Sequence, residues 1–401
     1  MKNKINPHMK NKTKAIIIVL DGVGAGPAPD SSQYGDRDPN TLGHVLQTAA
    51  SHGGFALPVL QRLGLGNIAP LPGIVPSHSP LASFGLMREL SAGKDTITGH
   101  WEMMGILNTA AFPTFPEGFP ADIILAFKEA TGMKKVLGNR AASGTVIIEE
   151  LGAEHMRTGY PIVYTSADSV FQIAAHTGVI GVEDLYGICE KARRVLSGPG
   201  KNICRVIARP FEGTPGSFKR LSAKRKDFPL PPPEETVIDR LSAKGVPVFS
   251  VGKVAEMFDM RGFPAGTVKT SSNRQGMEEL ARLVKTDGQC LIFANLNDFD
   301  TLFGHRNDPL GFAGALADFD RMLGEFLPLL NPEDYLFITA DHGNDPTTPG
   351  TDHSRELVPL LFIGGKKPGR DLGIRNGFMD LGATAARIFA VQAAAGKSFL
   401  L

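Results

Sequence analysis

Short runs of apolar residues alternate with amphipathic stretches through the C-terminal part of the chain. The apolar runs predict strands at 246–251 (VPVFSV), 290–296 (CLIFANL), 335–340 (YLFITA) and 357–363 (LVPLLFI). Helical periodicity predicts helices at 272–285, 312–330 and 379–391. The run AIIIVL at 15–20 has the same character and predicts another buried strand. Continuous apolar strands alternating with helices indicate an α/β fold whose mostly parallel sheet has helices on both faces.

The middle of the chain breaks this alternation. Residues 112–120 are rich in Pro and Phe, residues 205–226 are basic, and FPLPPP follows at 228–233. Such segments often mark domain boundaries. We therefore expect a core formed by residues 13–109 and 228–401, interrupted by a smaller inserted α+β domain at 110–227.

Composition and charge exclude several classes of protein. Of the 401 residues, 42% are hydrophobic and 21% are charged, and the formal net charge is +1. These values do not favour a disordered chain, a nucleic-acid partner or an anionic membrane. The apolar runs are also shorter than the roughly 20 residues that a membrane-spanning helix needs. We expect no nucleic-acid and no membrane partner, and the oligomeric state is not indicated.

The cysteines and the N-terminus favour a cytoplasmic protein. Cys189, Cys204 and Cys290 are odd in number and widely spaced, so a disulfide framework is not expected. A Lys-rich leader precedes AIIIVL, but that run is too short for the apolar region of a signal peptide. Met9 is an alternative start within this leader.

Three predicted strands end in aspartate. Asp21 follows the first strand, Asp300 comes just after CLIFANL, and Asp341 follows YLFITA. In open parallel sheets, ligands bind outside the carboxyl ends of the strands, so these carboxylates are expected in one crevice. Carboxylates that lie so close together repel one another, which raises their pKa values. A bound divalent cation removes this repulsion.

Histidines accompany the same segments, at His305, His342 and His353. Mixed Asp/His ligation suits zinc or manganese better than calcium. Two such ions, typically ~3.5–4 Å apart, can bind both the attacking and the leaving oxygen of a phosphoryl transfer. Any single aspartate after a strand has a second interpretation as an Asx-turn or helix N-cap. Three aspartates with histidine neighbours favour the metal site.

A further segment, GKDTITGHWE at 93–102, carries a candidate nucleophile. Metal coordination can activate a threonine hydroxyl, which is otherwise a weak nucleophile. The start of a helix would also place Thr96 near backbone N–H donors and the positive end of the helix dipole. The alternative is that Thr96 or Thr98 simply caps the helix.

Taken together, the motifs resemble the phosphopentomutase family. They are DGVGAG, GKDTITGHWE, TSADSVFQIAAH, VIARPFEG, NLNDFDTLFGHRND and ITADHGNDPTTPGTDHSRE, and they span nearly the whole chain. The resemblance implies an alkaline-phosphatase-like core with an inserted cap domain. It also implies interconversion of (deoxy)ribose 1-phosphate and (deoxy)ribose 5-phosphate through a phosphothreonine enzyme and a bisphosphate intermediate.

The same resemblance implies roles for individual residues. Thr96 would carry the phosphate, beside two manganese ions. One ion would be held by Asp21, Asp341 and His342, and the other by Asp300, His305 and His353. A sugar bisphosphate such as glucose 1,6-bisphosphate would prime the dephosphorylated enzyme.

The sugar phosphate substrate would contact a further set of residues. Asp168 matches a residue implied to touch the sugar, with Ser166 and Val170 nearby. Arg205, Arg220 and Lys253 are candidates for binding the substrate phosphate, because Arg binds phosphate in a bidentate manner and Lys acts as a point charge. Arg209 and Arg225 are alternatives for these roles, and surface Arg or Lys is often merely solvated.

Two positions depart from the family pattern. Gly22 follows the first aspartate where Ser is usual, and Asn297 stands before Asp300 where an apolar residue is usual. Both changes could alter hydrogen bonds around the metal ligands and so tune metal affinity. Three other functions compete with the mutase: a phosphatase or phosphodiesterase on the same core, a cofactor-independent phosphoglycerate mutase, and a non-catalytic metal-binding or sugar-phosphate-binding protein.

Overall fold

The structure is a computed structural model that describes residues 12–166, 168–198, 201–365 and 367–401. Residues 1–11, which include Met9 and most of the basic leader, therefore lie outside the described residues. The chain divides into two compact units. The core unit contains the described residues up to Ala110 and Pro232–Leu401, and the inserted unit contains Ala111–Pro231. Each unit is considered by itself.

The core unit is built on an eight-stranded sheet in the order β10-β9-β11-β1-β12-β13-β2-β14. All pairings are parallel except those of β13, which runs antiparallel to both β12 and β2. The mostly parallel α/β fold is thus confirmed. The strands are β1 (Lys14–Leu20), β2 (Ser83–Arg88), β9 (Val248–Val251), β10 (Gly266–Val268), β11 (Cys290–Leu296), β12 (Tyr335–Thr339), β13 (Val358–Ile363) and β14 (Asp371–Asn376).

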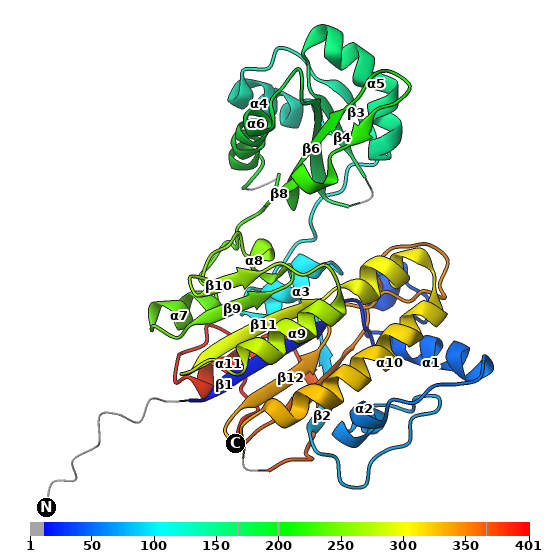
Figure 1. Cartoon of the computed structure of the whole chain (residues 1–401), viewed down its shortest axis with the longest axis vertical. Coiled ribbons are helices and arrows are strands. Elements are labelled where there is room, and N and C mark those ends of the chain that lie inside the picture. Colours follow the sequence, from blue (N-terminus) through cyan, green and yellow to red (C-terminus); the bar gives the residue numbers. More distant parts are fainter. Residues whose placement is uncertain (1–11, 167, 199–200, 366) are drawn as a thin grey trace, which may run out of the picture. The chain divides into compact units, whose positions relative to one another are not determined.

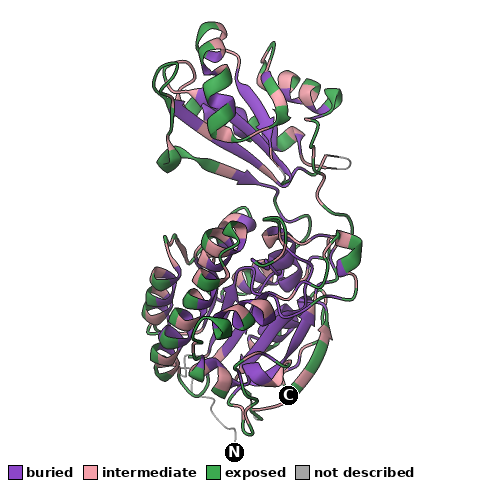
Figure 2. Cartoon of the chain, turned by 90° about the vertical axis from the view of Figure 1, so that its right-hand side faces the viewer, coloured by how far each residue is buried: buried purple, intermediate pink, exposed green. Residues whose placement is uncertain are grey.

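Burial explains why these segments form central strands. Every residue of β1 and β11 is buried, as expected for strands covered on both faces. Figure 2 shows this contrast between the purple strands and the helices with exposed green surfaces. The two edge strands differ, since all three residues of β10 are intermediate, and four of the six residues of β14 are exposed and the other two intermediate.

Two groups of helices pack around the core sheet. In one group α10 contacts α1, α2 and α9, and in the other α3 contacts α8 and α11 while α7 contacts α11. The helices are α1 (Thr41–Ser51), α2 (Pro58–Leu63), α3 (Thr96–Met103), α7 (Val237–Ala243), α8 (Val254–Met257), α9 (Asn273–Leu283), α10 (Pro309–Phe326) and α11 (Met379–Ile388). Side-chain caps define several starts: the Ser272 hydroxyl accepts from Gln275 N at α9, and the Asp308 carboxylate accepts from Gly311 N at α10.

The inserted unit has its own six-stranded sheet, in the order β3-β4-β5-β6-β7 with β8 also paired to β6. Helices α4 and α6 cover one face, and α5 covers part of the other (Figure 1). Its elements are β3 (Leu137–Ala141), β4 (Ile162–Thr165), β5 (Val170–His176), β6 (Arg205–Glu212), β7 (Lys219–Arg220), β8 (Lys226–Pro229), α4 (Ala121–Thr131), α5 (Gly144–Thr158) and α6 (Val182–Val195). The unit extends past Asp227 because β8 continues to Pro229 along β6.

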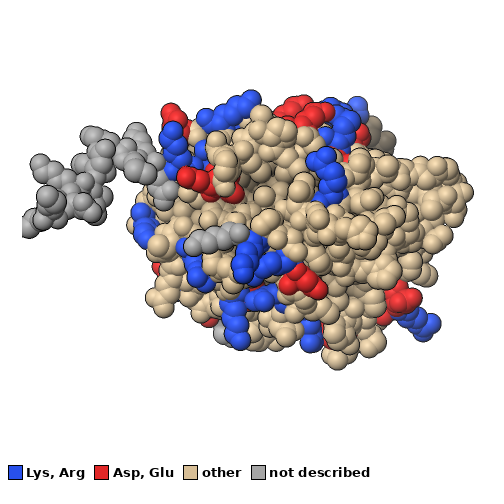
Figure 3. Space-filling model, turned by 90° about the horizontal axis from the view of Figure 1, so that it is seen from below, with Lys and Arg blue, Asp and Glu red and all other residues tan. Residues whose placement is uncertain are grey.

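None of the described helices is both long and apolar enough to cross a bilayer. On the face drawn in Figure 3, basic and acidic side chains are scattered over a largely uncharged surface. That pattern agrees with the net charge of +1.

Candidate metal centre

The carboxyl ends of three neighbouring strands bring the acidic residues together. Strand β1 lies between β11 and β12 and is parallel to both, with Leu20 opposite Leu296. Asp21 follows β1 and Asp341 follows β12 within two residues, while Asp300 sits on a π-helical turn just after β11. All three carboxylates are buried. Although they are far apart in the sequence, the three aspartates therefore lie at the same edge of the sheet.

Asp300, His305 and His353 form one candidate ligand group, whose ligand atoms all lie within 4.8 Å of one another. His305 Nε2 is 3.2 Å from Asp300 Oδ2, and His353 Nε2 is 3.3 Å from Asp300 Oδ1. The opposite ring nitrogens face backbone carbonyls: His305 Nδ1 is 2.6 Å from Thr351 O, and His353 Nδ1 is 2.9 Å from Lys94 O. Donation from Nδ1–H to these carbonyls leaves both Nε2 atoms free to ligate a cation.

Asp21, Asp300 and His342 form the second candidate group within the same 4.8 Å limit. His342 Nε2 lies 3.3 Å from Asp21 Oδ1 and 3.6 Å from Asp341 Oδ2. The family resemblance implied that Asp341, rather than Asp300, shares an ion with Asp21 and His342. In the structure Asp300 belongs to both groups, and Asp341 lies beside the second.

Two oxygens of this cluster lack the hydrogen bonds that buried carboxylates normally have. Among the described residues, Asp21 Oδ1 and Asp341 Oδ2 are buried and make no hydrogen bond of regular geometry, although an imidazole nitrogen lies 3.3 Å from each. Burial raises the pKa of Asp21, and the neighbouring Asp341 and Asp300 carboxylates raise it further. Divalent cations would satisfy these oxygens and offset the repulsion, so the residues present fit the metals that the resemblance implies.

Imidazoles already offset part of the negative charge. Burial alone would raise the pKa of Asp300, but His353 and His305 hold it well below its usual range. Burial lowers the pKa of His342, yet Asp341 and Asp21 hold it well above its ordinary value. The site therefore balances carboxylates against imidazoles, the donor set typical of zinc or manganese.

Thr96 is the first residue of α3 and faces this cluster. Its Oγ1 lies 3.1 Å from His342 Nε2. The helix is capped by Asp95, whose carboxylate accepts from Ile97 N and Thr98 N, each at 3.1 Å. The alternative that Thr96 or Thr98 caps α3 is therefore wrong. The Thr98 hydroxyl is fully buried and donates to Asp95 Oδ2 at 2.6 Å, so Thr96 is the hydroxyl that faces the candidate ligands.

The role of Arg355 was not predicted from the sequence, although this residue lies inside the TDHSRE motif. It is 2% exposed and forms ion pairs with Glu89 at 2.5 Å and Asp30 at 3.0 Å. Its guanidinium also donates to the carbonyls of Ser91 and Gly93 at 2.9 and 2.7 Å. It thereby holds the segment that leads into α3. Nothing in a single sequence pairs an arginine with a loop some 260 residues earlier.

His100 and Asn295 were also missed. Asn295 Nδ2 donates to Asp21 Oδ2 at 3.0 Å from within β11. His100 Nδ1 lies 2.8 Å from Thr96 O and 3.3 Å from Asp341 Oδ2, and the His100 side chain is fully buried. These two residues link the candidate nucleophile helix to both carboxylates. The sequence contained one indication of the role of Asn295, because this residue is polar and lies inside the apolar strand β11.

The two departures from the family pattern have different surroundings. Gly22 has φ 77°, a conformation that favours glycine, and its N–H donates to Asp341 Oδ1 at 3.2 Å. A Cβ there would lie 3.1 Å from the Asn344 Cβ. Asn297 follows β11 and its amide donates to Thr301 Oγ1 at 3.1 Å. Gly22 therefore touches a candidate ligand directly, whereas Asn297 stabilises the turn that carries Asp300.

The structure separates the expected substrate residues into two units. In the inserted unit, Arg205 pairs with Asp168 at 3.4 Å, and Val170 is its neighbour across β5 and β6. Ser166 follows β4, and Arg220 lies on β7 opposite Phe211. Lys253 belongs to the core unit, where it precedes α8. Asp168, Val170 and Arg205 are thus brought together, and Arg220 lies on a different strand.

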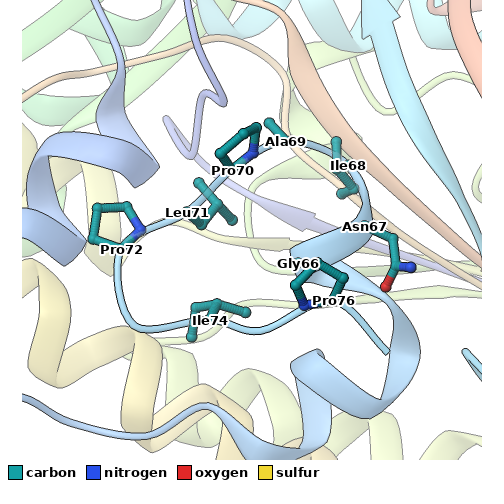
Figure 4. A pocket seen from close by; sticks show the side chains of 9 residues that line it. All are labelled: Gly66, Asn67, Ile68, Ala69, Pro70, Leu71, Pro72, Ile74 and Pro76. Carbon is teal, nitrogen blue, oxygen red and sulfur yellow. The ribbon is translucent and has the colours of Figure 1, made fainter. Parts of the chain in front are cut away.

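A separate pocket in the core unit is formed by one loop, 66–76 (Figure 4). Its lining residues are Gly66, Asn67, Ile68, Ala69, Pro70, Leu71, Pro72, Ile74 and Pro76. None of these side chains is titratable. The side chains of the pocket therefore offer no acid or base.

Comparisons with known proteins agree with the site. A model of the metalloenzyme superfamily matches residues 13–393. The phosphopentomutase of Anaeromyxobacter dehalogenans strain 2CP-C is 52% identical over 390 residues, 97% of this chain and 98% of that relative. The phosphopentomutase of Caldanaerobacter subterraneus subsp. tengcongensis is 51% identical over 389 residues, 96% of this chain and 97% of that relative. The chain belongs to the phosphopentomutase family of the metalloenzyme superfamily.

A solved structure supports the fold alone. The PH0037 protein from Pyrococcus horikoshii matches with a TM-score of 0.50 and 16% sequence identity, covering 95% of this chain and 98% of that chain. The predicted fold class and family are confirmed. The roles of individual residues stay predictions.

Proposed function

We propose that this protein interconverts the 1-phosphate and 5-phosphate of ribose or deoxyribose, with Thr96 as the phosphorylated residue. One observation carries the assignment: Thr96 Oγ1 lies 3.1 Å from His342 Nε2, beside the buried carboxylates that follow three strands. Family membership implies a sugar phosphate substrate, and a hydroxyl at this position can accept and return a phosphoryl group.

The transfer proceeds in two balanced steps. The bond between Thr96 Oγ1 and phosphorus breaks as a sugar hydroxyl oxygen bonds to the phosphorus and loses its proton, giving a sugar bisphosphate. The bond between the other phosphorus and its sugar oxygen then breaks as Thr96 Oγ1 bonds to that phosphorus, and the released sugar oxygen takes up a proton to give the isomeric monophosphate. A sugar bisphosphate such as glucose 1,6-bisphosphate would phosphorylate an enzyme that had lost its phosphate.

We assign the cluster to two divalent cations, with manganese as the preferred pair. Asp300, His305 and His353 would hold one, and Asp21, Asp341 and His342 the other, with Asp300 close to both. Bound there, the cations would stabilise negative charge on the transferring phosphoryl group.

The remaining residues of the core orient the nucleophile. Asp95 caps α3 and so fixes the first turn that carries Thr96. Arg355 binds the carbonyls of Ser91 and Gly93, which holds the preceding loop. Such positioning contributes to rate because small displacements of a reacting atom are costly.

The residues expected to bind the substrate remain part of the proposal. Asp168, Ser166 and Val170 would contact the sugar, and Arg205, Arg220 and Lys253 would bind phosphate. The contact between Asp168 and Arg205 at 3.4 Å supports a shared role for these two residues. We also propose a cytoplasmic location, in line with three buried cysteines that form no disulfide.

The direct experiment is a mutase assay with manganese and glucose 1,6-bisphosphate, before and after chelation. Ribose 1-phosphate should be converted to ribose 5-phosphate, and chelation should abolish the conversion. Release of inorganic phosphate without ribose 5-phosphate would instead identify a phosphatase and overturn the proposal.

A further inference from the structure

One face of the inserted sheet carries arginines that lack acidic partners. Arg209 on β6 donates from Nε to Gln172 Oε1 at 3.0 Å, and Arg220 lies on the adjoining β7. Neither guanidinium forms an ion pair with any residue that the structure describes. Arg209 is only partly exposed, and burial together with the nearby Arg225 lowers its pKa. Two unneutralised cations on one face favour an anionic ligand.

Their neighbours Arg205 and Arg225 differ in this respect. Arg225 forms a two-pronged pair with Asp227, with both contacts at 2.7 Å. Arg205 lies 3.4 Å from Asp168 and 3.7 Å from Asp227. These two arginines already have carboxylates, so an incoming anion would compete for them. Arg209 and Arg220 have no such competition among the described residues.

A buried hydroxyl points to the same place. Tyr164 on β4 is 1% exposed, and its hydroxyl makes no hydrogen bond of regular geometry with the described residues, although the Arg209 guanidinium lies close to it. Burial raises the pKa of Tyr164, and the guanidinium groups of Arg209, Arg220 and Arg225 oppose that shift. A buried hydroxyl without a regular hydrogen bond is costly, unless a ligand supplies the missing bond.

The N-terminus of α5 completes the arrangement. This helix is 15 residues long, and the side chain of its N-cap residue, Ser143, forms no capping hydrogen bond. A Cβ on Gly144 would lie 2.6 Å from the Tyr164 hydroxyl and 3.4 Å from Arg220 Nη1. Both groups therefore lie against the first turn, whose free N–H groups and dipole favour an anion. Glycine at 144 leaves them room.

We propose that Tyr164, Arg209, Arg220 and the first turn of α5 form a binding site for a phosphate group. This proposal rests on the function proposed above, because it takes the ligand to be the phosphate of a sugar phosphate. Arg220 was expected to bind substrate phosphate, with Arg209 as an alternative, whereas Tyr164, Gly144 and the helix terminus are new to the site. The Arg220 side chain is exposed, and its Nη1 and the Tyr164 hydroxyl both lie close to Gly144. Inorganic phosphate shares the chemistry and serves as a probe.

The test measures phosphate binding by calorimetry on full-length protein carrying Thr96→Ala, in the presence of a chelator. Under these conditions neither covalent transfer nor metal-bound phosphate contributes. Arg209→Gln should weaken binding of ribose 5-phosphate about tenfold, because a charge-assisted hydrogen bond is lost. Tyr164→Phe removes one oxygen and leaves the packing intact, and should weaken binding several-fold.

Arg194→Ala is the matched control, because Arg194 is an exposed arginine on α6, which packs on the opposite face of the inserted sheet. It should leave the affinity unchanged. Equal affinities for the parent, Arg209→Gln and Tyr164→Phe would overturn the site. Binding of inorganic phosphate but not of ribose 5-phosphate or glucose 1,6-bisphosphate would overturn the sugar phosphate as its ligand.

Mutase activity of the unmodified protein with manganese separates the two proposals. If the enzyme is active but its phosphate affinity is unchanged by Arg209→Gln, the proposed site is wrong and the proposed function stands. If the enzyme is inactive but its phosphate affinity depends on Arg209 and Tyr164, the proposed function is wrong and the proposed site stands.

Discussion

The two units of this protein present opposite charge imbalances. In the core unit, Asp21, Asp300 and Asp341 are buried together, and two of their oxygens make no hydrogen bond of regular geometry with the described residues. In the inserted unit, Arg209 and Arg220 lie together around a tyrosine hydroxyl that also lacks a regular hydrogen bond within the described chain. Excess buried carboxylate requires cations, whereas excess guanidinium requires an anion.

This contrast shows how a nearly neutral chain can hold strongly charged sites. The formal net charge of +1 averages over both units and hides the imbalance of each. A metal-dependent phosphotransferase needs both kinds of site, because the cations act on the transferring group and an arginine site can hold a second phosphate.

The largest effect should come from the nucleophile. Thr96→Ala should reduce kcat by at least about a thousandfold, since no residue replaces the lost oxygen. Intact-mass spectrometry should detect phosphorylated wild-type chain and no phosphorylated variant. Thr98→Val is the control, because the Thr98 hydroxyl is committed to Asp95. Full activity of Thr96→Ala would remove Thr96 from this role.

The buried arginine of the core should matter more than the exposed arginines of the inserted unit. Arg355→Ala leaves buried Glu89 without its partner and should lower the free energy of unfolding by about 3–5 kcal/mol. Arg225→Ala, which breaks an exposed pair with Asp227, should cost less than about 1 kcal/mol. Denaturant unfolding of both variants measures the difference. Equal, small effects would show that Arg355 does not hold the loop before α3.

A buried glutamate makes the core sensitive to pH. Burial raises the pKa of Glu356 from 4.5 to about 7. The folded state therefore binds a proton that the unfolded state releases, so stability falls as pH rises from about 4.5 to about 7, by roughly 3 kcal/mol in all. Glu356→Gln cannot ionise and should lack this contribution. Unfolding of both proteins in chelator at pH 5 and pH 8 gives the comparison, and parallel pH profiles would contradict it.

The smallest effect on stability should come from Asp168. Its side chain is 60% exposed beside Arg205, so Asp168→Asn should change the free energy of unfolding by less than about 1 kcal/mol. We expect KM for the sugar phosphate to rise about tenfold, because a charged hydrogen-bond acceptor is lost. Manganese content should be unchanged. Loss of manganese would show that Asp168 does not serve the sugar.

Much of the core could be predicted from hydrophobic pattern alone. The strand at 290–296 was placed to the residue, and helix α9 within two residues at each end, because apolar runs bounded by polar residues leave little choice. The candidate ligands followed from their positions after strands, since parallel strands share one edge.

The supporting residues could not be predicted in this way. Arg355 reaches a loop more than 250 residues away, and His100 acts through a backbone carbonyl as well as a carboxylate. Tyr164 read as an ordinary strand residue, and its isolated hydroxyl is visible only once Gly144 lies beside it. Such contacts depend on tertiary packing, which leaves no periodic signal in one sequence.

The central claim is that the core cluster holds two cations and that Asp300 serves both. Manganese content per chain, measured by elemental analysis after removal of unbound metal, tests it most directly. Wild type should retain two ions, His305→Ala one, and Asp300→Ala neither, because Asp300 belongs to both ligand groups. Retention of two ions by Asp300→Ala, or of none by the wild type, would contradict the account.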